Sequence, residues 1–554
     1  MTEMIIPGTY ITVRAEGLIS AGRIATGVVG VIGTAASGPL DTPITLAGFG
    51  DARELFGLPD TFNRPQDGAN PLTLVRALEQ IYNNGAATVV AVRVASSTVA
   101  SATFAVRAAS DQPALVTLEA RTPGTWGNDI QLLLEPAEEP CRIENDRLVA
   151  DFTNLNYAPV MPSAENQIRI IRGANRSVAT LNIVYQLDEG ATVSPGQVLV
   201  NPVDGRLTFA EGEQPDPGAN DVLLANYLVD RERCVTMTLE HGPIRERFTV
   251  PDGHILAQRI NQSSRLVTAR DAVLGTRLPT AINAHLGSGS NTPGNNGADA
   301  NADAYATGLA AIANQVVNIV VLAGQDTASA GAVLLGHLNV TARTDYERIG
   351  VIGAAGNELA DYLGHTMASD RVVVVAPGIA TPDGSTLPTA YTAAAVAGLI
   401  SALPVQTSLT NKTLNVPGLA LRFNRGQQEQ LIRRNVLAVV SREGLRVLKG
   451  ITTEGEGAPF AAIPTRRIVD FAKYGVRSAA NPYIGRLNNE RVRSALRATL
   501  DSFLTRMVAD EALTAYELEV SATRAQEIAG EVNVVMTLQP TFSIEFVRVT
   551  MLLQ

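Results

Sequence analysis

The chain has 554 residues, of which 45% are apolar and 18% charged, and its formal net charge at pH 7 is −10. This length exceeds one ordinary domain, so two to four domains with sizeable cores are expected. The acidic balance argues against a general nucleic-acid binder, and the longest nearly apolar stretch, 393–405, is shorter than the roughly 18 residues that a membrane span needs. We therefore expect neither direct contact with nucleic acid nor insertion into a membrane.

The first residues predict a protein that folds in a cytoplasm. Glu3 and Pro7 stand where a secretion signal would carry a basic and then an apolar run. Cys141 and Cys234 are the two cysteines of the chain, too few for a disulfide framework, and they lack a CxxC spacing. We expect both to be ordinary reduced thiols.

Residues 1–27 predict an N-terminal arm, a short strand on a glycine-rich tether. The strand would contain Tyr10, Ile11, Thr12 and Val13, which are β-branched or aromatic. Because an isolated strand cannot satisfy its own backbone groups, this one must add to a sheet, either in a neighbouring molecule or by folding back locally.

Residues 28–96 and 277–404 predict two parts of one α/β domain. The first part has apolar segments at 28–32 and 88–94 with a helix at 70–83 between them, the order of a βαβ unit. The second part repeats this alternation, with helices from Asp303 and Ser329 and at 390–402, and apolar segments at 316–322, 349–352 and 372–375.

Residues 97–276 differ in character and predict an inserted, β-rich outer domain. Short alternating runs such as 167–171 and 197–200 are typical of strands, and Asp-Gly pairs at 204–205 and 252–253 are typical of turns.

Residues 405–554 predict an α+β domain of opposite charge. They contain 19 basic and 14 acidic residues, a net charge of +5 that leaves −15 for the rest of the chain. A helix at 488–509 carries an apolar stripe at helical spacing. Two half-buried strands follow, one with Tyr516, Leu518 and Val520 on one face, the other with Val532, Val534, Met536 and Leu538.

A final strand is expected at 542–552, and its apolar pattern changes face. Ile544 and Phe546 occupy one face, and then Val547 and Val549 occupy the other. A bulge would cause that change, as would a strand that crosses from one environment into another.

Patterns that carry chemistry are weak, so we expect no catalytic, cofactor or metal site. The five histidines lack ligand spacing, and neither a hydrolase elbow nor a phosphate-binding loop occurs. Asp299, Asn301 and Asp303 resemble half of a calcium loop, but Ala304 and Ala310 stand where its glycine and glutamate are needed. We interpret these carboxylates as loop and helix-capping groups.

Short motifs occur in a definite order along nearly the whole chain: Pro7-Gly8-Thr9-Tyr10, Thr122-Pro123-Gly124-Thr125-Trp126-Gly127-Asn128, Thr465-Arg466-Arg467-Ile468, Ala480-Asn481-Pro482-Tyr483-Ile484-Gly485, and Gln539-Pro540-Thr541-Phe542-Ser543-Ile544-Glu545-Phe546. Individually they are unspecific, but their order resembles the tail sheath family of contractile phages, R-type pyocins and contractile injection systems. The sequence departs from that pattern around Leu513 and in the large middle region.

The resemblance implies a non-enzymatic sheath subunit that stacks as six-fold rings in a helical array around an inner tube and contracts to drive the tube through a target envelope. It implies assembly in a bacterial cytoplasm into a tail or injection particle, with further copies of this chain, the tube protein, and baseplate and terminator proteins as partners. Neighbours would exchange terminal strands: the arms contain Tyr10, Ile11, Thr12, Val13, Ile544, Phe546, Val547 and Val549, and the receiving edge contains Val532, Val534 and Met536.

The positive C-terminal domain would then face the tube, with Arg493 and Arg497 as the tube-facing candidates. An alternative is that both arginines are solvated or pair with Asp501 and Glu490. Two other functions also stay open: an α/β enzyme with a cofactor at a loop such as 324–327, and another self-assembling tube or shell protein.

Overall fold

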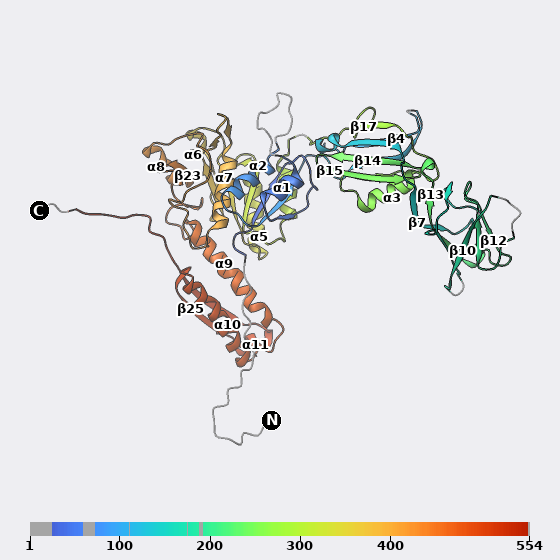
Figure 1. Cartoon of the computed structure of the whole chain (residues 1–554). Coiled ribbons are helices and arrows are strands. Elements are labelled where there is room, and N and C mark those ends of the chain that lie inside the picture. Colours follow the sequence, from blue (N-terminus) through green and yellow to red (C-terminus); the bar gives the residue numbers. More distant parts are fainter. Residues whose placement is uncertain are drawn as a thin grey trace, which may run out of the picture. The chain divides into compact units, whose positions relative to one another are not determined.

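The computed structural model describes residues 25–58, 72–109, 111–173, 176–187, 192–297 and 299–551 (Figure 1). These residues form two compact units. The second unit consists of residues 36–39 and 97–297, and the first unit consists of the remaining described residues. The predicted N-terminal strand with Tyr10, Ile11, Thr12 and Val13 lies outside the described residues.

Eight described strands form the central sheet of the first unit, in the order β2-β3-β1-β18-β19-β20-β23-β24. The six inner strands are parallel, and each edge strand is antiparallel to its neighbour. The inner strands are buried along nearly their whole length, as in parallel sheets covered on both faces. Their bounds are β1 Val29–Gly33, β2 Ile44–Leu46, β3 Val89–Arg93, β18 Ile319–Asp326, β19 Ile349–Gly353, β20 Val372–Ala376, β23 Val436–Ser441 and β24 Leu445–Val447.

Helices cover both faces of this sheet. The core on one face contains Val29 and Val31 of β1 together with α2 and α7, and the core on the other contains Ile32 with α4 and α5. The predicted βαβ unit is confirmed, because β1 and β3 pair in parallel. The remaining elements include a small hairpin, β21 with β22. The bounds are α1 Phe49–Phe56, α2 Leu74–Asn83, α4 Ala302–Ala311, α5 Gly331–Arg343, α6 Leu359–Leu363, α7 Thr389–Ala402, α8 Arg425–Arg433, β21 Ile379–Ala380 and β22 Thr386–Leu387.

The second unit is built mainly of antiparallel strands around one apolar core. Its three sheets have the orders β15-β14-β6-β17, β16-β5-β4 and β12-β11-β10-β9-β13-β7, and β8 also pairs with β13. The bounds are β4 Thr103–Arg107, β5 Ala114–Ala120, β6 Gln131–Pro136, β7 Cys141–Leu148, β8 Val160–Met161, β9 Gln167–Ile171, β10 Val178–Tyr185, β11 Gln197–Val200, β12 Leu207–Phe209, β13 Val222–Val229, β14 Val235–His241, β15 Ile244–Val250, α3 Gly253–Ser263, β16 Val267–Arg270 and β17 Ile282–His285. Short 3₁₀ turns lie at Thr125–Asp129, Pro217–Ala219 and Arg231–Arg233.

Two expected domain boundaries differ from the structure. Strand β17 pairs with β6, so residues 277–297 belong to the second unit and not to the α/β domain expected at 277–404. Strand β23 pairs with β20, so the sheet continues beyond residue 405, where the C-terminal domain was expected to begin. Short apolar runs predict strands, but they do not indicate which sheet a strand joins.

The C-terminal part of the first unit contains two long helices and a hairpin. The apolar stripe predicted for the second helix is buried: Leu496, Leu500, Phe503, Leu504 and Met507. Helices α9 and α10 lie side by side, and the hairpin of β25 and β26 packs on α10 (Figure 1). Among the described helices, none has the length and apolar character that crossing a membrane requires. The bounds are α9 Ile463–Ala480, α10 Glu490–Ala509, β25 Leu513–Ser521, α11 Arg524–Ala529 and β26 Asn533–Pro540, with a 3₁₀ turn at Asn481–Tyr483.

Gly475 allows α9 to approach α10 closely, because a methyl group at this position would overlap the Phe503 ring. We predict that Gly475→Ala destabilises this helix pair by about 1–3 kcal/mol through overpacking. Amide hydrogen exchange of peptides from α9 and α10 measures the change locally. Gly336→Ala on the exposed side of α5, where a methyl group meets nothing, is the matched control. It should stabilise α5 by about 0.5–1 kcal/mol, and equal protection of α9 in both variants would contradict the close contact.

Candidate assembly surface

The hairpin of β25 and β26 has one face on the helices and two outer edges. Its ladder runs from the pair Leu513 and Pro540 to the pair Ser521 and Asn533. Among the described residues no strand pairs with either outer edge. A two-stranded sheet is marginal by itself, and open edges are templates for a further strand.

The residues predicted for the edge that receives a neighbour's strand lie on or just before β26. Val534 and Met536 are partly buried and pack toward α10, whereas Val532 precedes the strand and is 37% exposed. The half-buried alternation predicted for both strands is confirmed. The side chains therefore fix the hairpin on its helix, and the backbone of the strand forms the outer edge.

Residues 541–551 follow β26 without joining a ladder within the described chain. Their large apolar side chains, with exposed fractions of 71–84%, are Phe542, Ile544, Phe546, Val547, Val549 and Met551. Within the described chain no strand pairs with residues 542–551, so the strand expected at 542–552, which a neighbouring copy would complete, stays a prediction. An extended, exposed apolar segment needs a partner surface to bury it.

Lys449 holds the beginning of this C-terminal segment. Its Nζ lies 3.4 Å from Oε2 of Glu545 and 6.0 Å from the centre of the Phe546 ring. A cavity of about 490 Å³ lies beside this contact, lined by Phe542, Ser543 and residues around 449–465. The segment therefore crosses the surface next to the central sheet before its last apolar residues.

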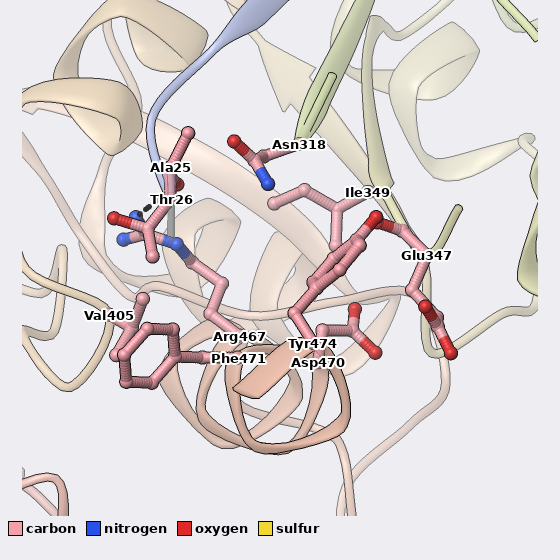
Figure 2. A pocket seen from close by; sticks show the side chains of 10 residues that line it. All are labelled: Ala25, Thr26, Asn318, Glu347, Ile349, Val405, Arg467, Asp470, Phe471 and Tyr474. Carbon is pink, nitrogen blue, oxygen red and sulfur yellow. Dashed lines mark hydrogen bonds between the residues drawn. The ribbon is translucent and has the colours of Figure 1, made fainter. Parts of the chain in front are cut away.

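Arg467 of α9 holds the chain where the described residues begin (Figure 2). Its Nη2 donates to the carbonyls of Thr26, at 3.3 Å, and Leu403, at 3.0 Å, and its Nη1 donates to that of Pro404. Burial lowers the pKa of Arg467 to about 10. A cavity of only about 20 Å³ is left between this guanidinium and the surrounding side chains, which include Ala25. The base of the N-terminal segment is therefore fixed on α9.

A buried ion cluster attaches the first turns of α9 to the central sheet. Asp470 accepts hydrogen bonds from Arg371, at 2.9 and 3.0 Å, and from Arg466, at 2.8 Å. Arg466 also pairs with Asp370 at 2.9 Å and stacks over the ring of Phe460. Arg371 lies just before β20, so this contact is made at the amino-terminal end of a parallel strand.

Glu347 extends the cluster two turns along α9, to Arg477 and to Lys473 at 3.5 Å. The hydroxyl of Tyr474 donates to the Glu347 carbonyl at 2.8 Å. Burial favours the neutral carboxyl, but the hydrogen bond and charge of Arg477 outweigh it, so the pKa of Glu347 lies below its usual value. Glu347 precedes β19, and α9 is therefore tied to two adjacent strand ends.

The two tube-facing candidates differ in their surroundings. Arg493 has a side chain only 15% exposed, and its Nη1 lies 2.9 Å from Glu527 of α11. Arg497 is exposed on α10. Asp501, which the alternative interpretation assigned as a partner, instead accepts a 2.7 Å hydrogen bond from Tyr516.

A cavity of about 330 Å³ lies at the carboxyl ends of β18 and β19, near the loop 324–327 considered for a cofactor. The titratable side chains that line this cavity form hydrogen bonds with nearby backbone groups. Asp361 caps the first turn of α6, and His365 Nε2 contacts the Arg434 carbonyl at 2.7 Å. Within the described ranges no group of three or more His, Cys, Asp or Glu is arranged to hold a metal ion. Helix α4 is capped by Asn301, whereas the sequence suggested the neighbouring carboxylates.

Sequence reasoning missed the anchors Arg467 and Lys449 and the carboxylates of the ion cluster. One signal was available, because Asp470 lies four residues after Arg466 on a helix, where opposite charges meet. The partners Arg371 and Glu347 are far away in sequence, and only the fold brings them to α9.

The described residues thus form a multidomain α/β protein with open sheet edges and an extended, exposed apolar segment. Residues 298–453 match the family model described as the phage tail sheath protein central domain, and residues 456–554 match that of the phage tail sheath C-terminal domain. Residues 298–554 thus carry, in order, the central and C-terminal domains of the phage tail sheath family. No curated protein sequence matches the chain.

Two solved sheath tail proteins share the fold at low identity. A sheath tail protein from Desulfitobacterium hafniense is 16% identical with a TM-score of 0.58, covering 96% of this chain and 100% of its own. A sheath tail protein from Listeria innocua is 12% identical with a TM-score of 0.55, covering 94% and 96%. A sheath complex of an extracellular contractile injection system in the contracted state is 19% identical over 42% of this chain and 70% of its own, with a TM-score of 0.37.

The ion pair of Glu347 predicts a pH dependence of stability. A glutamate in an unfolded chain has a pKa of about 4.3, and Glu347 in the folded chain has a lower one. Its ion pair therefore stabilises the folded state fully above about pH 4.3, and this stabilisation is lost as the pH falls through the folded-state pKa. We expect Glu347→Gln to lower the thermal midpoint at pH 7 and the difference from the unmodified chain to shrink below about pH 4. Glu429→Gln, at an exposed pair, is the control and should change the midpoint little. A difference for Glu347→Gln that is independent of pH would contradict this assignment.

Proposed function

We propose that this chain is the sheath subunit of a contractile tail or injection particle. Copies would stack as six-fold rings in a helical array around an inner tube, and contraction of the array would drive the tube through a target envelope. The observation that supports this most directly is that one subunit has two features together. Its hairpin of β25 and β26 has open edges, and its C-terminal segment is apolar and exposed.

Exchange of strands between copies would complete the hairpin on both sides. The C-terminal segment, with Ile544, Phe546, Val547 and Val549, would add to one edge of a neighbour's hairpin, and the N-terminal arm of another copy to the other edge. Each backbone hydrogen bond gained contributes about 0.5–1.5 kcal/mol net, and burial of the exposed apolar side chains adds to this. The link is therefore strong enough to persist while subunits move.

The two anchors would separate each arm from the rigid body of its subunit. Arg467 fixes the chain at Thr26, and Lys449 fixes the segment at Glu545, so the free parts begin at defined points. Bending beyond these points would let whole subunits rotate and slide between an extended and a contracted array. The work of contraction would come from the difference between two packings of the same subunits, without nucleotide hydrolysis.

The inner tube would lie against the C-terminal part, whose sequence from residue 405 onward carries a net charge of +5. Exposed Arg497 is the better of the two candidates, because Arg493 is held by Glu527. Baseplate and terminator proteins would bind the two ends of the cylinder. Assembly would take place in a bacterial cytoplasm before the particle is released.

Truncation of either arm tests the strand exchange. A chain that ends at Pro540, and one that lacks residues 1–22, should each be folded, soluble and unable to form cylinders. Electron microscopy and sedimentation measure assembly, and circular dichroism measures folding. Val178→Asp, at an exposed apolar position of β10, is the matched control and should still form cylinders. Normal cylinders from either truncated chain would refute the proposed exchange.

Reversal of charge tests the tube contact. Arg497→Glu should leave self-assembly intact and weaken co-sedimentation with purified tubes at least several-fold at low salt, with a smaller effect at high salt because screening weakens exposed charge contacts. Arg422→Glu, at another exposed arginine, should not change tube binding. Equal tube binding by both variants would remove Arg497 from the contact.

A further inference from the structure

The two cysteines of the 554-residue chain lie together in the second unit. The chain passes from β6 to β7 and returns from β13 to β14, and these are the two connections between the sheet of β15-β14-β6-β17 and the larger sheet that contains β7 and β13 (Figure 1). Cys141 is the first residue of β7, and Cys234 immediately precedes β14. Each connection therefore ends at a cysteine.

The strand registers bring the two connections side by side. Cys141 is the direct cross-strand neighbour of Val229, the last residue of β13. The Cys234 Sγ lies 4.0 Å from the carbonyl of the same Val229, and the backbone of Cys234 accepts a hydrogen bond from Ala137. Both cysteines are therefore neighbours of Val229, and both are almost completely buried.

A guanidinium makes the two thiols chemically different. Arg259 of α3 places Nη2 3.5 Å from the Cys141 Sγ, and it is held there by hydrogen bonds to the carbonyls of Thr249, at 2.6 Å, and Arg142, at 2.5 Å. The Cys234 thiol, more than any other group, lowers the pKa of Cys141; Arg259 adds to this, and burial and the charge of Asp252 oppose it. The pKa of Cys234 is raised, chiefly by the neighbouring Cys141 thiol. Cys141 is thus the better nucleophile of the pair.

We propose that Cys141 and Cys234 are a built-in site for an intrachain disulfide, formed when a small peroxide oxidises the folded chain. The Cys141 thiolate attacks one peroxide oxygen, the O–O bond breaks, and Cys141 becomes a sulfenic acid as water leaves. The Cys234 sulfur then displaces the hydroxyl from that sulfenic acid, and its thiol proton leaves with the hydroxyl as a second water. In sum, two thiols and one hydrogen peroxide give one disulfide and two waters.

The bond would tie the two connections to each other. It would close a loop of 92 residues between the two cysteines. This loop begins with the second residue of β7 and extends past the end of β13. Cross-linking a loop of this length restricts the unfolded state and raises the unfolding midpoint. It would also stop the larger sheet from separating from its neighbour at this point, which suits a subunit that is made under reducing conditions and then works outside a cell.

The test uses the full chain and hydrogen peroxide. After exposure, the denatured protein should show no free thiols, a mass lower by two hydrogen atoms, and one peptide pair that joins Cys141 to Cys234. The unfolding midpoint of the second unit, followed by the fluorescence of Trp126, should rise by on the order of 5 °C and return after reduction. Two free thiols remaining in the folded chain, or bonds formed only between chains, would overturn the proposal.

Variants separate the roles of the groups. Cys234→Ser should stop at a sulfenic acid on Cys141 that a dione reagent traps, whereas Cys141→Ser should leave Cys234 unreactive under the same conditions. Arg259→Gln should slow disulfide formation about tenfold by weakening the thiolate. Arg247→Gln, at an exposed position of β15, is the matched control and should react at the unmodified rate. Equal rates in the two arginine variants would exclude the proposed role of Arg259.

Discussion

Backbone groups at the edge of a strand need hydrogen-bond partners, and the hairpin of β25 and β26 leaves two such edges open within the described chain. In water this is tolerable, because solvent satisfies the groups. It also makes the hairpin the natural place for an added strand. The exposed apolar residues after Pro540 have the complementary need, since nothing in the described part of the chain covers them. The proposed lattice meets both needs with one interaction.

A lattice of this kind can transmit force only if each hairpin is fixed to the rest of its subunit. The ion cluster around Asp470 and Glu347 provides that connection, because it joins successive turns of α9 to the strand ends before β19 and β20. Helix α10 then packs on α9 across Gly475, and the hairpin packs on α10. Movement of the central sheet would therefore reach the hairpin through ion pairs and packed side chains.

The repetitive features of the fold could be predicted from the sequence. The run Val372–Ala376 predicted a strand because it is short, rich in β-branched residues and apolar throughout, and the stripe around Leu500 and Leu504 predicted a helix because it recurs at helical spacing. The sheet to which β17 and β23 belong could not be predicted, since that depends on pairing between distant segments. The final strand is a related case: residues 541–551 have the composition of a strand, but no partner strand lies in the described part of the single subunit, so this prediction depends on a second copy.

The charge of the C-terminal part shows why a site is harder to predict than a fold. A count of basic residues suggested a positive surface, yet several of the arginines serve the subunit itself. Arg466 and Arg477 neutralise buried carboxylates, and Arg467 binds backbone carbonyls. Arg493 is likewise committed to Glu527. The charge available to a partner is therefore smaller than the net value, and exposed residues such as Arg497 and Arg506 carry it. The proposed contact with a tube would therefore be weak and screened by salt, and weak contacts suit the proposed sliding of the sheath.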